Sequence, residues 1–124
     1  MMRILLAAPD RDLLECYRKI LEEPFGEVVT AFDGTQIPPL LQAEHFDLVL
    51  FDDEIPRTDR RSLLRRIREK KIPVIEMKAG TGGRSDPLPD AYLPYPFTPE
   101  EICGTIREVL RKAENATEEE NSNE

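Results

Sequence analysis

Short apolar runs alternate with helix-like patterns along the 124 residues of the chain. Runs of this kind are typical of strands buried on both faces of a parallel sheet. They occur at five places: residues 4–8, 28–30, 48–51, 73–75 and 91–93. Strands that alternate with helices favour a right-handed, doubly wound arrangement. The pattern therefore predicts an α/β fold around a five-stranded parallel sheet.

The first two helical segments carry clear start and stop signals. Apolar positions recur at helical spacing from about residue 12, with Asp10 or Asp12 available as the N-cap. Pro24 and Gly26 are expected to stop this helix. A second helix is expected within residues 36–44, and it should be short because two prolines stand near its start.

Two further helices are expected nearer the end of the chain. Leu63, Leu64 and Ile67 share a helical face that should continue to about residue 71. The last helix should begin at Thr98, which can form a capping box with Glu101.

Two segments lack the marks of regular structure. Glycines and prolines are dense in residues 79–90, so we expect a loop there, where the alternation would otherwise place a helix. Residues 114–124 hold five acids, no bases and no large apolar side chain. We therefore expect a folded domain at 1–113 and a disordered acidic tail at 114–124.

Composition narrows the class of protein. The chain has 17 Lys and Arg against 25 Asp and Glu, a formal charge of −8. No apolar run approaches the roughly 18 residues of a membrane span, so no membrane association is expected. Cys16 and Cys103 form neither a disulfide framework nor a metal motif. A cytoplasmic protein with reduced thiols is the simplest interpretation.

Five segments, taken in order, resemble the receiver domain of two-component response regulators. They are VVTAFDG at 28–34, FDLVLFD at 46–52 followed by Pro56 and Asp59, LLRRIR at 63–68, IPVI at 72–75, and YLPYPFTPEE at 92–101. The resemblance covers residues 3–112 and implies the flavodoxin-like strand order 2-1-3-4-5. It also implies that the fourth helix of the family is missing here or replaced by the loop at 79–90.

The resemblance gives Asp52 the place of the aspartate that accepts a phosphoryl group. A carboxylate can act as such a nucleophile when Mg²⁺ offsets the charge of the donor. The family holds this Mg²⁺ with two adjacent acids, which read Ala8 and Pro9 here. Asp10 follows and could join Asp52 at a weak metal site, or cap the first helix instead. We therefore expect no cofactor, and at most weak Mg²⁺ binding.

Other family positions are also changed. Lys78 replaces a Ser or Thr, and we hypothesise that it pairs with Asp52 in place of the metal. Tyr95 replaces the lysine before Pro96, and its phenol should either lie at the rim of the site or pack at the surface against a partner. The Tyr95–Pro96 peptide is expected to be cis. Tyr92 keeps the aromatic position associated with switching.

These substitutions favour a stand-alone, degenerate receiver, or pseudo-receiver, that works in phosphorelay signalling by protein–protein interaction. Its partner would be a histidine kinase or a downstream effector, and a homodimer is an alternative. We expect no enzymatic activity beyond, at most, self-phosphorylation of Asp52 from a phosphodonor. The first alternative is a phosphoryl-accepting single-domain regulator that uses Asp52 with an altered metal site.

A second alternative rests on a basic segment. Residues 57–71 contain eight Lys and Arg with only Asp59 and Glu69 opposing them, and Arg60 and Arg61 could lean toward the acids at 52–54. Arg65 and Arg66 are candidates for an anion- or nucleic-acid-binding face. No aromatic residue is interleaved among these arginines, so nucleic acid is not the expected partner.

Overall fold

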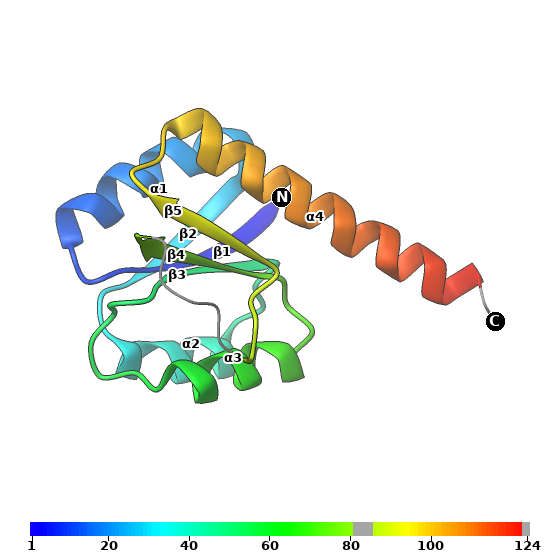
Figure 1. Ribbon diagram of the computed structural model, residues 1–124, viewed down its shortest axis with the longest axis horizontal. Helices are drawn as coiled ribbons and strands as arrows, with labels where there is room; N and C mark the ends of the chain where they lie inside the picture. Colours follow the sequence, from blue (N-terminus) through cyan, green and yellow to red (C-terminus); the bar gives the residue numbers. More distant parts are fainter. Residues whose placement is uncertain (81–85, 123–124) are drawn as a thin grey trace.

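The computed structural model describes residues 1–80 and 86–122, with side chains described to residue 116. Its centre is a sheet of five parallel strands (Figure 1). The strands are β1 (Met2–Ala7), β2 (Gly26–Ala31), β3 (Leu48–Asp52), β4 (Val74–Ala79) and β5 (Ala91–Tyr95). Their order, β2-β1-β3-β4-β5, confirms the predicted doubly wound topology.

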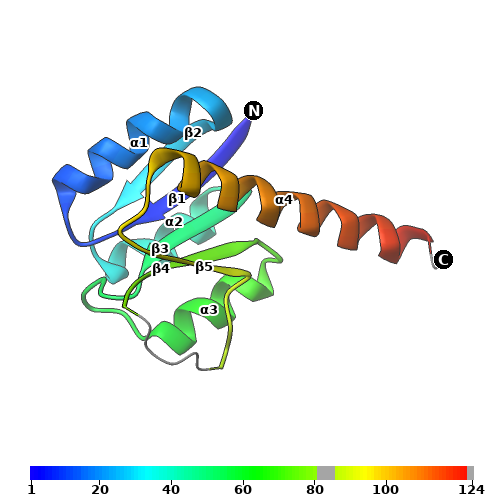
Figure 2. The same ribbon diagram turned by 45° about the horizontal axis from the view of Figure 1, so that its top comes forward.

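Helices cover both faces of the sheet. They are α1 (Arg11–Phe25), α2 (Ile37–Ala43), α3 (Arg60–Glu69) and α4 (Pro99–Ser122), with a short 3₁₀ turn, η1 (Gly34–Gln36), before α2. Figures 1 and 2 show α1 and α4 on one face and α2 and α3 on the other. None of these helices, over the part of the chain that the structure describes, has the length and hydropathy to cross a membrane.

Each layer has its own apolar core. The first core lies between the sheet and the α1/α4 layer, where Leu21 and Ile106 are fully buried. The second lies between the sheet and the α2/α3 layer, where Leu41 and Leu64 are almost wholly buried. Burial on both faces explains why the strands read as continuous apolar runs rather than as alternating ones.

The first helix ends one residue later than its proline suggests. α1 includes Pro24 and ends at Phe25, and the Gly26 amide donates a hydrogen bond to the Glu22 carbonyl. Gly26 has a φ of +133°, and a Cβ there would lie 2.5 Å from the Met2 carbonyl oxygen. Glycine is therefore required where the chain turns directly from α1 into β2.

The predicted loop between β4 and β5 contains no helix in its described part, residues 80 and 86–90. Gly82 and Gly83, which contributed to that prediction, lie outside the described residues.

The last helix begins as predicted and continues beyond the predicted end of the domain. Thr98 Oγ1 accepts a hydrogen bond from the Glu101 amide, and the Thr98 amide donates one to the Glu101 carboxylate, which completes the capping box. α4 then continues past Ala113 to Ser122, since neither glycine nor proline interrupts it after Gly104. The division of the chain at residue 113 stays a prediction.

Two leucines of α1 test the core between the sheet and the α1/α4 layer. Leu21 is fully buried, whereas Leu13 is 42% exposed on the same helix. Leu21→Ala should lower the free energy of unfolding by about 2–5 kcal/mol, because it removes buried methyl groups and leaves a cavity. Leu13→Ala should change it by less than about 0.5 kcal/mol. Urea denaturation of both variants checks this, and equal effects would contradict the packing described.

Candidate functional site

Asp52 is the last residue of β3 and lies at the carboxyl edge of the sheet, where ligands bind in doubly wound folds. Its side chain is 8% exposed and its two oxygens have different donors within the chain. Oδ1 accepts a hydrogen bond from the Glu54 amide at 2.7 Å. Oδ2 accepts one from the Tyr95 hydroxyl at 2.6 Å. The carboxylate is therefore bound on both sides by its own chain.

Tyr95 reaches Asp52 from the far side of β4. It is the last residue of β5 and pairs with Ala79 in the sheet register. Its ring stacks on Phe97 with centroids 5.1 Å apart, and the Tyr95–Pro96 peptide is cis, as predicted. Burial, followed by the hydrogen bond to Asp52, raises the pKa of Tyr95 above its ordinary range. Of the two predicted placements, the phenol takes the one at the site.

The residues expected around a metal do not form a ligand set. Ala8 is buried and Pro9 is exposed, and neither side chain has an oxygen to offer. Asp10 caps α1, with its carboxylate accepting hydrogen bonds from the Asp12 and Leu13 amides. Among the described residues, no group of three or more His, Cys, Asp or Glu side chains is arranged to hold a metal ion. Mg²⁺ usually binds through one or two carboxylates and keeps several waters, so weak Mg²⁺ binding at this edge stays a prediction.

Asp53 directly follows Asp52 at the carboxyl end of β3. Its amide donates to the Met77 carbonyl at 3.0 Å, which extends the β3–β4 pairing by one residue. Its Oδ1 is buried and has no hydrogen-bond partner within the described structure. Burial and the neighbouring Asp52 charge raise the pKa of Asp53, and the positive charge of Lys78 opposes them.

Lys78 does not form the hypothesised ion pair with Asp52. Among the ion pairs between described side chains, none joins Lys78 to Asp52. The alternation of side chains along β4 explains this, because Lys78 lies on the face opposite Met77, whereas Asp52 lies on the same face as Met77. The Tyr95 hydroxyl is the partner of Asp52 instead.

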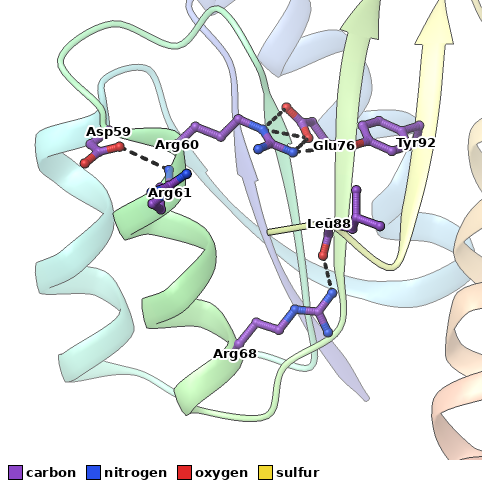
Figure 3. Close-up of polar contacts among 7 residues, drawn as sticks. All are labelled: Asp59, Arg60, Arg61, Arg68, Glu76, Leu88 and Tyr92. Atoms are coloured by element: carbon purple, nitrogen blue, oxygen red, sulfur yellow. Dashed lines mark hydrogen bonds and ion pairs between the residues drawn. The ribbon is translucent and has the colours of Figure 1, made fainter. Parts of the chain in front are cut away.

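A second polar cluster lies on the α3 side of the sheet (Figure 3). Glu76, in the middle of β4, is fully buried. Arg60, the first residue of α3, binds it through Nε at 2.9 and 3.1 Å and through Nη2 at 2.8 Å. The same Nη2 lies 3.4 Å from the Tyr92 hydroxyl. Arg60 was expected to lean toward the acids at 52–54, and it binds Glu76 instead.

Glu76 was overlooked in the sequence, although a signal was present. It is a single acid inside the apolar strand 74–77, and a charged residue at such a position needs a buried partner. The sequence did not indicate which of the α3 arginines would supply it.

The remaining arginines of α3 divide between inward and outward positions. Arg68 donates to the Leu88 carbonyl and lies 3.7 Å from an Asp90 carboxylate oxygen, so it ties α3 to the segment before β5 (Figure 3). Arg65 and Arg66 are exposed, and no ion pair between described side chains includes them. Their role in binding an anion stays a prediction.

The comparisons with known proteins agree with this geometry. No family model matches the sequence. The chain is 36% identical to "Probable transcriptional regulator ycf27" of Cyanophora paradoxa over 111 aligned positions, covering 81% of this chain and 46% of that protein. It is 30% identical to "Transcriptional regulatory protein CpxR" of Escherichia coli K12 over 128 aligned positions, covering 98% of this chain and 55% of that protein. The chain thus spans about half the length of these curated relatives.

Solved structures of similar fold are receiver domains. A CheY-like response regulator receiver domain protein from Methanospirillum hungatei superimposes with a TM-score of 0.79 at 26% identity, covering 94% of this chain and 98% of that one. The signal receiver domain of an HD domain-containing protein from Pseudomonas fluorescens has a TM-score of 0.79 at 23% identity, with 94% and 92% covered.

The sheet order and these similarities define a flavodoxin-like α/β domain. More narrowly, they place the chain among the receiver domains of two-component response regulators.

The hydrogen bond between Tyr95 and Asp52 can be tested by stability. Tyr95→Phe should lower the free energy of unfolding by about 1–3 kcal/mol at pH 8, because it removes a hydrogen bond to a carboxylate. The pKa of Tyr95 is raised in the folded protein above its value in the unfolded chain. The stabilisation that its hydroxyl gives the folded state should therefore be fully present below about pH 10, and it should be lost as the pH rises from there toward the folded-state pKa. Urea unfolding of both proteins at pH 8 and above pH 10 checks this.

The control for this measurement is Asp52→Asn, alone and combined with Tyr95→Phe. If the two side chains are coupled, the double variant should lose less stability than the sum of the single losses. Additive losses, or a wild-type advantage that does not shrink with pH, would contradict the contact.

Substitution of the buried Glu76 in β4 should reduce stability far more than substitution of an exposed acid. Glu76→Ala leaves the Arg60 guanidinium without its partner in a largely buried position, so we expect a loss of about 3–5 kcal/mol in unfolding free energy. Glu69→Ala removes an exposed acid of α3 and should change stability by less than about 0.5 kcal/mol. Thermal and urea denaturation measure both, and similar effects would show that Glu76 is not paired as described.

Proposed function

We propose that the chain is a degenerate receiver, which acts in signal transduction by binding another protein rather than by accepting a phosphoryl group. One observation carries the proposal: the Tyr95 hydroxyl donates a 2.6 Å hydrogen bond to the oxygen of Asp52 that the Glu54 amide leaves available. A nucleophilic carboxylate must present a free oxygen to the incoming phosphorus.

The surrounding residues support the same proposal. Phosphoryl transfer is mostly positioning and charge compensation, supplied by a metal ion and by cationic or hydrogen-bonding side chains. Here Ala8 and Pro9 provide no ligands, and a phenol stands where the resemblance implies an ammonium. Asp52 also lies beside Asp53, whose charge would add to the repulsion of an anionic donor.

The partner in this proposal is a protein, either a histidine kinase or a downstream effector. The contact surface would lie on β5, α4 and the segment at 86–90, in the region where the family has a helix and the described residues of this chain form none. Leu88, at 44% exposure, is a large apolar side chain available for such a contact. Association of two copies through the same surface is an alternative, and a cytoplasmic location is part of the proposal.

The competing possibility is a receiver that still accepts a phosphoryl group on Asp52. Its support is the position of Asp52 at the end of β3, at the edge where doubly wound folds bind ligands. It requires the Tyr95 hydroxyl to move away from Oδ2 and an altered set of metal ligands.

Intact-mass spectrometry after incubation with acetyl phosphate and Mg²⁺ separates the two possibilities. We expect the chain to gain no phosphoryl group, because Tyr95 occupies the nucleophile and no acidic pair holds the metal. The matched control is the triple variant Ala8→Asp, Pro9→Asp, Tyr95→Lys, which restores the family's acids and lysine and should gain one phosphoryl group.

Two outcomes decide the question. A gain of one phosphoryl group by the unmodified chain, abolished by Asp52→Asn, would overturn the proposal in favour of the competing possibility. No gain by the chain, together with a gain by the triple variant, would support it and would show that the lost side chains are the reason.

A further inference from the structure

The two polar clusters lie on opposite faces of the sheet. Along β5, Ala91, Leu93 and Tyr95 pack in the core beneath α1 and α4. Since successive side chains of a strand point to opposite faces, Tyr92 lies on the α3 face. It approaches Arg60 of α3 there, at 3.4 Å (Figure 3). The two tyrosines of this strand thus belong to different layers.

Side chains of β3 and β4 are divided between the two faces of the sheet in the same way as those of β5. In β4, Ile75 and Met77 pack beneath α1 and α4, which leaves Glu76 between them on the α3 face. In β3, Leu48 and Leu50 belong to the α1/α4 core, so Asp52, two residues further on, shares that face. Asp52 and Tyr95 are therefore on one side of the sheet, and Arg60, Glu76 and Tyr92 are on the other.

Different structural elements hold the two clusters. The Arg60–Glu76 contact uses three hydrogen bonds between a planar guanidinium and a carboxylate, the most rigid geometry available to an ion pair. Arg60 is fixed in turn at the start of α3, where Asp59 caps the helix through the Arg61 amide. Asp52 and Tyr95 are held instead by the Glu54 amide and by the hydrogen bond between their own side chains.

We propose that the Arg60–Glu76 pair holds Tyr92 in one position whatever the state of Asp52. Arg60 and Glu76 are positioning residues, and they join α3, β4 and β5 directly. The surface around Tyr92 is then permanently formed, with no signal passing to it from the carboxyl edge. This coupling goes beyond the proposed function and is independent of whether Asp52 accepts a phosphoryl group.

The test uses NMR signals of the tyrosine rings in the whole chain. The chain has three tyrosines, so Tyr→Phe variants at 17, 92 and 95 assign the rings one by one. Asp52→Asn should shift the Tyr95 signals, because Tyr95 donates to that carboxylate, and should leave the Tyr92 signals in place. Glu76→Gln should do the reverse, since it removes the charge that orders Arg60. Each tyrosine is thereby the control for the other.

Two results would overturn the inference. One is a Tyr92 shift in Asp52→Asn comparable with the shift of Tyr95, which would show that the clusters communicate. The other is an unchanged Tyr92 signal in Glu76→Gln, which would show that the pair does not position the ring. If Glu76→Gln fails to fold, Arg60→Lys replaces it, because lysine keeps the charge and loses the two-pronged geometry. Tyr92 should then shift and Tyr95 should not.

These measurements separate the inference from the proposed function. Phosphorylation of Asp52 in the mass experiment would refute the degenerate receiver without moving the Tyr92 signals. Conversely, a Tyr92 ring that follows Asp52→Asn would refute the inference even where no phosphoryl group is gained.

Discussion

Burial of the central strands on both faces is the constraint on which the rest of the structure depends. β1 and β3 contribute side chains to both apolar cores, so a slip of one residue in their register would exchange the two cores. The register is therefore firmly set, and it fixes which side chains meet at the carboxyl edge. It also fixes which face of the sheet each polar residue occupies, and so assigns Asp52 and Glu76 to different layers.

Each of these two carboxylates lies where the fold can supply its hydrogen-bond or ion-pair partners. Asp52 stands at the end of its strand, next to an edge where an amide and a phenol can reach it. Glu76 stands in mid-strand, where no solvent reaches, and an unpaired carboxylate would be very costly. The first residue of α3 provides the compensating charge, because the loop before it brings the helix start over β4. The pair ties α3 to the sheet in the region where a helix is absent from the described residues.

The proposed degenerate receiver would keep the fold of its family without the family's phosphoryl-transfer chemistry. A receiver domain needs the shape of the sheet for its surfaces, and it needs acids and cations at the carboxyl edge for phosphoryl transfer. The first need is met by apolar strands, which this chain retains. The second rests on a few side chains with little influence on folding, and in the proposed degenerate receiver it is not met, because Ala8, Pro9 and Tyr95 stand where the resemblance implies two acids and a lysine. The fold and the chemistry of the site can therefore diverge, and a similar fold is evidence for the shape of the domain but not for phosphoryl transfer.

Much of this organisation follows from the sequence alone. The five strands and the capping box at Thr98 are local or pattern-based, so apolar runs and turn residues suffice to predict them. The order of the strands in the sheet was implied by the family resemblance instead. Contacts between side chains from distant elements were not predictable in this way. The sequence left Asp52 with Lys78 as a possible partner, and only the alternation of faces along β4 and β5 gave that place to Tyr95. Likewise, no local pattern could connect Arg60 to Glu76, because their meeting depends on how α3 crosses the sheet.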